Sequence, residues 1–218
     1  ATTTVTVGPA VIDAVPDTLG PINGSTGSTT PSVLANDTLN GVAVNPSQVT
    51  LTGVTVPAGM TLNADGTITV APGTPAGTYT VTYSICEVLN PTNCDTATTT
   101  VTVGPAVIDA VPDTLGPING YTGSTTPSVL ANDTLNGVAV VPSEVTLTGV
   151  TVPAGMTLNA DGTITVAPGT PAGTYTVTYS ICEVLNPTNC DTATTTVTVA
   201  PAVIDAVPDT LGPINGYT

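Results

Sequence analysis

The sequence contains no lysine, no arginine and no histidine, so none of its side chains carries a positive charge at neutral pH. Its 15 aspartate and glutamate residues give a formal net charge of −15. Nucleic acids are bound by cations that replace phosphate counterions, and anionic membranes attract basic segments. Apolar residues never form the run of about 18 that a membrane-spanning helix needs. We therefore expect no nucleic-acid partner and no membrane insertion.

The missing residue types also remove most enzyme chemistry. Without histidine or lysine the usual general bases are absent, and without arginine no side chain clamps a phosphate or carboxylate group. No serine has an evident activating partner, and a zinc site would need reduced cysteines because histidine is absent. The sequence therefore predicts a protein that is not an enzyme and needs no cofactor, with calcium as the one ion suited to its acidic surface.

Most of the sequence consists of two nearly identical repeats. Residues 8–103 and 104–199 are identical except at three positions, Ser25/Tyr121, Asn45/Val141 and Gln48/Glu144. Such a long period suits one independent β-domain per repeat rather than a solenoid unit. The predicted organisation is residues 1–8 as the last strand of a preceding repeat, 9–103 and 104–199 as two repeats, and 200–218 as the start of a third. We interpret the chain as a window from a longer protein.

The junctions between repeats are short and contain proline. Gly104-Pro105 follows the first repeat and Ala200-Pro201 follows the second. Proline fixes its own φ angle and restricts rotation far more than a glycine and serine linker would. We therefore expect successive repeats of the same chain to be each other's partners and to stand end to end as a semi-rigid rod.

The most regular part of each repeat spans residues 77–103 and, unchanged, 173–199. Val81, Tyr83 and Ile85 alternate with threonine and serine, which is the pattern of a half-buried strand, and a second alternating segment follows after a short loop. Cysteines at opposing positions of two adjacent strands lie within disulfide reach. The predicted disulfides are Cys86–Cys94 and Cys182–Cys190, and the alternative is two pairs of free thiols. Disulfides would indicate an oxidising, extracellular setting.

The rest of each repeat consists of short apolar segments between turn residues. Strands are expected within residues 10–15, over 32–35 and 42–44, and over 49–56 with a bulge at Gly53. Residues 60–62 and 67–70 form a predicted hairpin, whereas residues 16–31 read as a turn-rich connection. No segment has helical periodicity. The predicted fold class is all-β, with tandem immunoglobulin-like β-sandwich domains.

Aspartates gather near the start of each repeat, at the predicted ends of strands. Carboxylate oxygens at one pole of a domain are ligands that Ca²⁺ prefers, although their spacing fits no EF-hand loop. Calcium binding is therefore one hypothesis, and solvated surface acids are the alternative. The candidate ligands are Asp13, Asp17, Asp37, Asp109, Asp113 and Asp133.

A second polar pattern is Asp-Thr followed by an aliphatic or small residue. It resembles the acceptor motif for O-glycosylation in Bacteroidetes, in which the sugar is attached to the threonine. The alternative is chance in a threonine-rich chain. The candidate acceptors are Thr18, Thr38, Thr96, Thr114, Thr134, Thr192 and Thr210.

Three segments carry a wider resemblance: VLANDTLNG at 33–41, GMTLNADGTITV at 59–70, and the hairpin with its lead-in at 73–103. They resemble the repeats of giant type IX-secreted surface adhesins of Bacteroidetes, including the SprB-like adhesins of gliding motility. The resemblance implies immunoglobulin-like or cadherin-like modules at the cell surface that act as a structural stalk. Surface glycans or the substratum would then be bound through a domain outside these residues.

Two other functions remain open from the sequence. One is a carbohydrate-binding module that uses acidic side chains and Tyr121 and Tyr217 as platforms, although Ser25 stands at this position in the first repeat. The other is a subunit of a self-assembling multi-chain fibre, in which residues 1–7 complete the sheet of a neighbouring chain.

Overall fold

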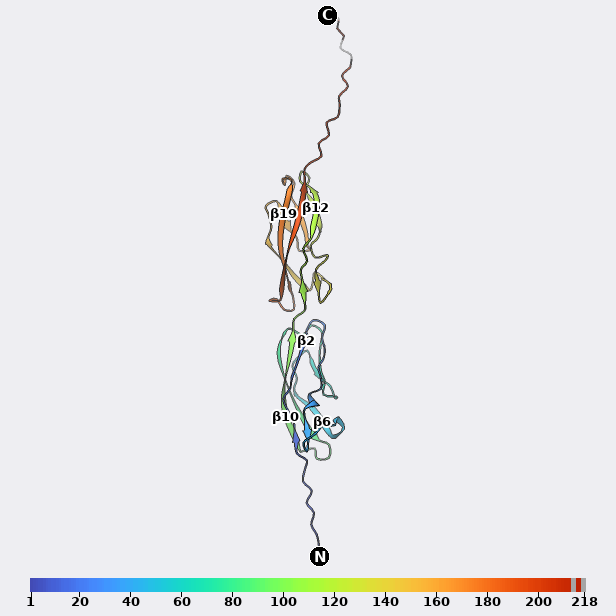
Figure 1. Cartoon of the computed structure of the whole chain (residues 1–218), viewed down its shortest axis with the longest axis vertical. Coiled ribbons are helices and arrows are strands. Elements are labelled where there is room, and N and C mark those ends of the chain that lie inside the picture. Colours follow the sequence, from blue (N-terminus) through green and yellow to red (C-terminus); the bar gives the residue numbers. More distant parts are fainter. Residues whose placement is uncertain (213–214, 217–218) are drawn as a thin grey trace. The chain divides into compact units, whose positions relative to one another are not determined.

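The structure, a computed structural model, describes residues 1–212 and 215–216. The described residues form β-strands and two short 3-10 turns, with no α-helix (Figure 1), which confirms the predicted all-β class. Within the same residues, no helix has the length and apolar character needed to cross a membrane. The chain divides into two compact units: Ala1–Asp109 with Thr134–Thr146 and Ile181–Asp191, and Ala110–Asp133 with Leu147–Ser180 and Thr192–Thr218.

The first repeat is organised around a four-stranded sheet. Its strand order is β2 (Thr18–Asn23), β10 (Cys94–Gly104), β9 (Gly77–Glu87) and β6 (Val49–Thr55). The long strands β9 and β10 pair antiparallel, whereas β2 runs parallel to β10. The edge strand β2, from the start of the repeat, therefore pairs with β10, its last strand.

Two small sheets complete the first repeat. One has the order β1 (Ile12–Asp13), β4 (Thr38–Leu39) and β5 (Val42–Ala43), and the other has the order β3 (Ser28–Thr29), β8 (Ile68–Val70) and β7 (Met60–Leu62). Ile68 and Met60 from the second of these small sheets pack in one core with Val81 and Tyr83 from the large sheet. The arrangement is a β-sandwich with a single core.

The second repeat has the same topology. Its large sheet has the order β12 (Thr114–Asn119), β20 (Cys190–Ala200), β19 (Gly173–Glu183) and β16 (Val145–Thr151). Its small sheets are β11 (Ile108–Asp109), β14 (Thr134–Leu135) and β15 (Val138–Ala139), and β13 (Ser124–Ser128), β18 (Thr163–Val166) and β17 (Met156–Leu158).

The long hairpin has the predicted alternation. Val81, Tyr83 and Ile85 are fully buried, whereas Thr80 and Thr96 on the opposite face are exposed. Residues 77–86 of β9 pair one to one with residues 94–103 of β10, so opposite residues of the two strands share a face. The core is aliphatic apart from tyrosine, as the absence of phenylalanine and tryptophan requires.

Two predictions about the earlier segments are wrong. Residues 32–35 form a 3-10 turn (Val33–Ala35) instead of a strand, because Ser32 caps it by accepting a hydrogen bond from the Leu34 amide. Residues 16–31 contain the strands β2 and β3 and are not only a connection. Pro21 is tolerated in β2 because this strand lies at the edge of the sheet, where the missing amide interrupts only one ladder and the register shifts.

Two other predictions are confirmed. Met60–Leu62 and Ile68–Val70 pair as a tight antiparallel hairpin. The bulge expected at Gly53 is present, since the register of β6 against β9 shifts between Gly53 and Thr55. The pole formed by the β9–β10 loop and the start of β6 is the part of the repeat where the polar side chains described next are concentrated.

Candidate functional site

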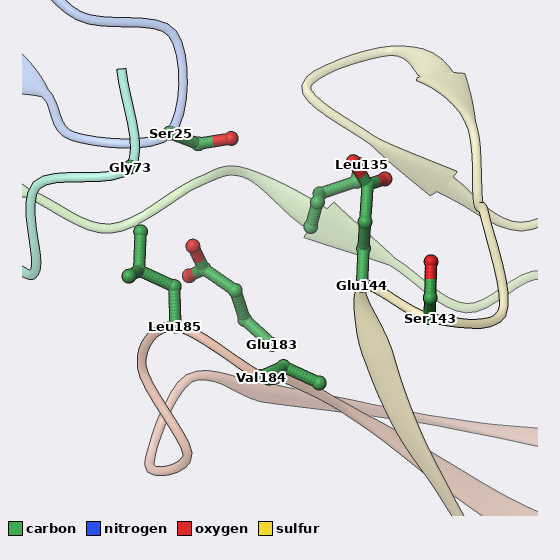
Figure 2. A pocket seen from close by; sticks show the side chains of 8 residues that line it. All are labelled: Ser25, Gly73, Leu135, Ser143, Glu144, Glu183, Val184 and Leu185. Atoms are coloured by element: carbon green, nitrogen blue, oxygen red, sulfur yellow. The ribbon is translucent and has the colours of Figure 1, made fainter. Parts of the chain in front are cut away.

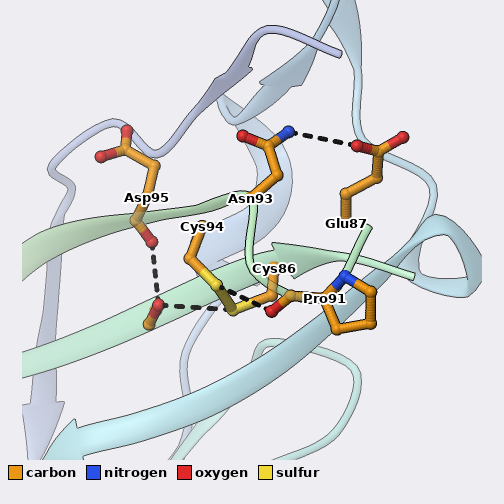
Figure 3. The surroundings of a disulfide bond; sticks show 7 residues. Cys86, Glu87, Pro91, Asn93, Cys94 and Asp95 are labelled. Atoms are coloured by element: carbon orange, nitrogen blue, oxygen red, sulfur yellow. Dashed lines mark hydrogen bonds between the residues drawn. A yellow bond between two sulfur atoms is a disulfide. The ribbon is translucent and has the colours of Figure 1, made fainter. Parts of the chain in front are cut away.

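A disulfide closes the end of the β9–β10 hairpin (Figure 3). Cys86 and Cys94 lie opposite each other in the ladder and their sulfur atoms are bonded at 2.03 Å, and Cys182 and Cys190 are bonded at 2.05 Å. Both predicted disulfides are therefore formed. The Cys94 sulfur lies 3.4 Å from the carbonyl oxygen of Pro91, which is a contact only, because an oxidised cysteine has no hydrogen to donate.

Inside the loop that this disulfide closes, the carboxylate of Glu87 accepts hydrogen bonds from two side-chain amides. The side-chain amides of Asn90 and Asn93 donate to Glu87 Oε2 at 2.8 and 3.1 Å, and Asn93 also donates to the carbonyl oxygen of Ala10. These two amides, that of Asn90 first, lower the pKa of Glu87 below its ordinary value. Glu87 therefore stays ionised and ties the loop to the chain at the start of the repeat.

The same loop in the second repeat, which belongs to the first compact unit, is bonded differently. Glu183 Oε2 accepts hydrogen bonds from Asn189 Nδ2 at 3.0 Å and from the Ala106 amide at 3.2 Å. Asn186 uses its Oδ1 to accept from the amide of Ala76 at 2.7 Å. As a result Glu183 Oε1 and Asn186 Nδ2 are buried without a hydrogen-bond partner.

A pocket of about 280 Å³ lies beside Glu183, and all its walls belong to the first compact unit. Figure 2 shows the carboxylate of Glu183 directed into the space near Ser25 and Leu185, and the side chain of Glu144 rising on the other side beside Leu135. The lining residues are Ser25, Gly73, Leu135, Ser143, Glu144, Glu183, Val184 and Leu185. The only charged groups on the walls are therefore two carboxylates.

The first repeat has the matching half of this pocket. A hollow of about 180 Å³ is lined by the six equivalent positions, Leu39, Ser47, Gln48, Glu87, Val88 and Leu89. Gln48 replaces Glu144, which is one of the three differences between the repeats. The pocket at Glu183 therefore differs from its counterpart in carrying a second acidic wall.

The fully buried Asp37 forms a second polar cluster in the core. Tyr83 donates its hydroxyl hydrogen to the Asp37 carboxylate, with O–O distances of 3.0 and 3.1 Å, and the Val15 amide donates to Asp37 Oδ1 at 2.7 Å. Burial raises the pKa of Asp37, and burial beside Asp37 raises the pKa of Tyr83. In the second repeat Tyr179 and Asp133 are bonded in the same way.

The structure brings the three acids of the calcium hypothesis close together in the first repeat. The charges of Asp17 and Asp13 contribute to raising the pKa of Asp37. Asp17 accepts a hydrogen bond from Thr99 at 2.9 Å, and its pKa is raised by burial, whereas Asp13 is exposed. In the second repeat Asp113 accepts from Thr195 at 3.0 Å and its pKa is also raised by burial, and Asp109 is exposed.

These acids do not form a metal cage. Across residues 1–212 and 215–216, no three histidine, cysteine, aspartate or glutamate side chains are arranged to hold a metal ion. Asp37 already accepts hydrogen bonds from Tyr83 and Val15, which occupy the oxygens that an ion would need. Calcium binding by this set stays a prediction.

The candidate glycosylation sites differ in access. Five threonines are exposed: Thr18, Thr96, Thr114, Thr192 and Thr210. Thr38 and Thr134 are only half-buried, but each follows a fully buried aspartate, Asp37 or Asp133. An enzyme that reads the aspartate of the motif on the folded chain would therefore reach the first five sites more easily. Sugar attachment itself stays a prediction.

The aromatic candidates for carbohydrate binding are also separated by the structure. Tyr121 is 75% exposed, whereas the equivalent Ser25 is half-buried beside the pocket. Tyr217 lies outside the described residues. No second described tyrosine accompanies Tyr121 on an open surface, since Tyr79 and Tyr175 use their hydroxyl groups on the carbonyl oxygens of Pro75 and Pro171.

Sequence reasoning missed Glu87 and Glu183. The signal was present, because the alternation of β9 places Glu87 on the same face as Val81, Tyr83 and Ile85. An acidic residue at an inward position is unusual unless it is paired or hydrogen-bonded. The unpartnered oxygen of Glu183 depends on which atom of Asn186 faces Ala76, which no sequence pattern reveals.

Comparison with known proteins gives only distant likenesses. No protein-family model matches the chain, and no curated protein matches it. It is similar to the structure of mouse cadherin-23 EC22-24, with 14% identity and a TM-score of 0.35 over 89% of this chain and 65% of that one, just under two thirds. Chicken VE-cadherin EC1-2 gives 14% identity and a TM-score of 0.36, over 85% of this chain and 96% of that one. The titin domains z1z2, in a complex with telethonin, give 11% identity and a TM-score of 0.42, over 91% of this chain and 100% of that one. At TM-scores below 0.5, these likenesses support no conclusion about activity or partners.

Proposed function

We propose that the chain is a run of structural stalk repeats from a long extracellular adhesin filament. The observation that carries this proposal is the tandem copying of a whole disulfide-closed β-sandwich with only three substitutions between copies. A stalk needs many equivalent modules, whereas a specific binding site favours divergence between copies. The role of each repeat is then to add length and stiffness.

Features of the sequence and of the junction support a stalk outside the cell. Gly104 ends β10 and Ile108 begins β11, so only residues 105–107 connect the two repeats, and Pro105 restricts the connection. Disulfides persist in oxidising compartments. The absence of lysine and arginine removes every site for trypsin-like proteases, which suits an exposed filament.

The resemblance of residues 73–103 to giant Bacteroidetes adhesins extends this proposal. On such a cell the filament would be exported by type IX secretion and would serve surface attachment or gliding. Exposed Asp-Thr sites such as Thr18 and Thr96 would carry O-linked sugar. The ligand would be a surface glycan or the substratum, bound by a domain outside these residues.

A carbohydrate-binding module is the second candidate function. The exposed Tyr121 is the observation that favours it, because aromatic faces stack on sugar rings, and acidic side chains can accept hydrogen bonds from sugar hydroxyls. This function would be confined to the second repeat, since Ser25 replaces the tyrosine in the first. A multi-chain fibre subunit is a further alternative.

Deletion of one complete repeat tests the proposal. Removing residues 104–199 in the producing cell joins Val103 to Ala200 and restores a repeat junction that differs from the natural one only by alanine for glycine. The stalk function predicts a filament shortened by one repeat, with attachment to the substratum retained at equal surface abundance. Loss of attachment by a filament of equal abundance, together with the same loss in Tyr121→Ser, would favour the carbohydrate-binding module instead.

A further inference from the structure

Glu183 carries a buried oxygen that no protein group satisfies. The residue is only 2% exposed, and its Oε2 accepts the hydrogen bonds from Asn189 and Ala106. Its Oε1 is buried without a partner. A buried carboxylate is stable only when a cation or sufficient hydrogen bonds compensate its charge. Because the chain has no lysine, arginine or histidine, any cation that compensates this charge comes from solution.

Glu144 brings a second carboxylate to the same pocket. Its backbone carbonyl accepts a hydrogen bond from the Val184 amide at 2.8 Å, so Glu144 is held beside the segment that contains Glu183. Figure 2 shows the two side chains on opposite sides of the pocket, Glu183 near Leu185 and Glu144 near Leu135, with Ser25 and Ser143 also on its walls. Every polar side-chain atom that lines the pocket is therefore an oxygen.

We propose that this pocket binds one calcium ion, with Glu183 Oε1 as the buried ligand and the Glu144 carboxylate as the second acidic ligand. Ca²⁺ takes six to eight oxygen ligands in a flexible shell, whereas Mg²⁺ demands a near-ideal octahedron. Two carboxylates and two hydroxyl groups leave the shell incomplete, and a volume of about 280 Å³ has room for the waters that complete it. Dissociation constants of about 10⁻⁴ to 10⁻³ M are typical of extracellular calcium modules.

The first repeat contains a natural control for this site. Its equivalent hollow has Gln48 in place of Glu144, and Glu87 there accepts hydrogen bonds from both Asn90 and Asn93. Of the described residues, only Glu183 and Asn186 have a buried side-chain atom without a partner. The hollow at Glu87 therefore binds no calcium, and the stoichiometry is one ion per chain.

A buried water molecule is the competing explanation. Asn186 Nδ2 is a donor and Glu183 Oε1 is an acceptor, so one water that accepts from the first and donates to the second would satisfy both atoms. Such a water needs no ion and leaves Glu144 without a role. The two explanations differ in whether the chain takes up calcium.

Calorimetric titration of the chelator-treated 218-residue chain with calcium chloride tests the proposal. The expected result is one ion per chain, with weaker binding of magnesium. Glu183→Gln should abolish binding, and Glu144→Gln, which installs the residue of the first repeat, should weaken it at least about tenfold because a close ligand charge is lost. No uptake by the wild-type chain up to about 10 mM calcium, well above the expected dissociation constant, would overturn the proposal.

Two control variants locate the ion. Glu87→Gln should leave calcium binding unchanged, and so should the combined change Asp13→Asn and Asp109→Asn in the acids first suspected from the sequence. Circular dichroism establishes that each variant is folded, and the exposed Glu144 provides a variant that does not disturb the core. Calcium binding that survives Glu183→Gln, or that is lost in either control, would contradict the proposed ligands. The calcium site is independent of the stalk function.

Discussion

The hydroxyl group of Tyr83 lies 3.0 Å from Oδ1 of the fully buried Asp37 and joins the long hairpin to the segment before β4. Tyr83→Phe should destabilise the first repeat by about 1–3 kcal/mol, because a buried acceptor loses a donor. The measurement is urea unfolding followed by circular dichroism. Tyr79→Phe is the matched control, since the Tyr79 hydroxyl bonds Pro75 at the surface. Equal effects of the two changes would contradict a special role for the buried pair.

Mild acid should stabilise the protein. Burial raises the pKa of Asp17, Asp37 and Asp113 above the ordinary value of 3.8, so the folded state binds protons more readily than the unfolded state. Stability contributed by such groups is fully present at low pH and is lost as the pH rises through their folded pKa. The free energy of unfolding should therefore increase as the pH falls from 7 toward about 4.

The increase in the free energy of unfolding should end at still lower pH. The pKa of Asp65 and Asp161 is lowered by hydrogen bonds from Thr67 and Thr163, and their contribution is lost as the pH falls through the folded pKa. Urea unfolding at a series of pH values and constant ionic strength measures the profile. Asp37→Asn should flatten the rise between neutral and mildly acid pH. An unchanged slope in this variant would show that Asp37 is not its source.

Loss of one disulfide should weaken one repeat. Cys86 and Cys94 are separated by 8 positions, and closing a loop of this size stabilises a fold by about 2–3 kcal/mol through the unfolded chain. Combined Cys86→Ala and Cys94→Ala changes should lower the free energy of unfolding by about this amount. The corresponding changes at Cys182 and Cys190 provide the matched comparison. A variant that unfolds at the wild-type urea concentration would contradict a stabilising role.

Two glycines with nearly the same positive φ angle allow the cost of backbone strain to be measured separately from the cost of side-chain crowding. Gly66 has φ +84° and a Cβ there would meet Ser32 and Leu34, whereas Gly73 has φ +82° and nothing nearby. Gly73→Ala should cost about 1–2 kcal/mol for the left-handed backbone alone. Gly66→Ala should cost about 1–3 kcal/mol more because the hairpin turn is overpacked. Thermal unfolding of the two variants measures the difference, and equal losses would refute the crowding.

Local patterns made the hairpin predictable. The alternation around Val81 and Tyr83 and the facing cysteines are short-range signals, and each is confirmed by the ladder between β9 and β10. The strand β2 could not be predicted in the same way, because its pairing is parallel and joins residues far apart in the sequence, such as Leu19 and Val101. The Gly20-Pro21 pair within this strand is locally typical of a turn.

The candidate site was less predictable than the fold. Asp37 was expected near a pole with other acids, but its burial beneath Tyr83 depends on the closed sandwich. The role of Glu183 depends on Asn186 turning its oxygen toward Ala76. Residue types and spacing therefore indicate which acids are available, while tertiary contacts decide which of them lack a partner.

Electron microscopy of the intact filament tests the central claim most directly. A stalk of tandem repeats predicts a single thread of beads with a uniform axial period, one bead for each 96-residue repeat. A helical lattice built from many separate chains would contradict the stalk and favour a self-assembling fibre.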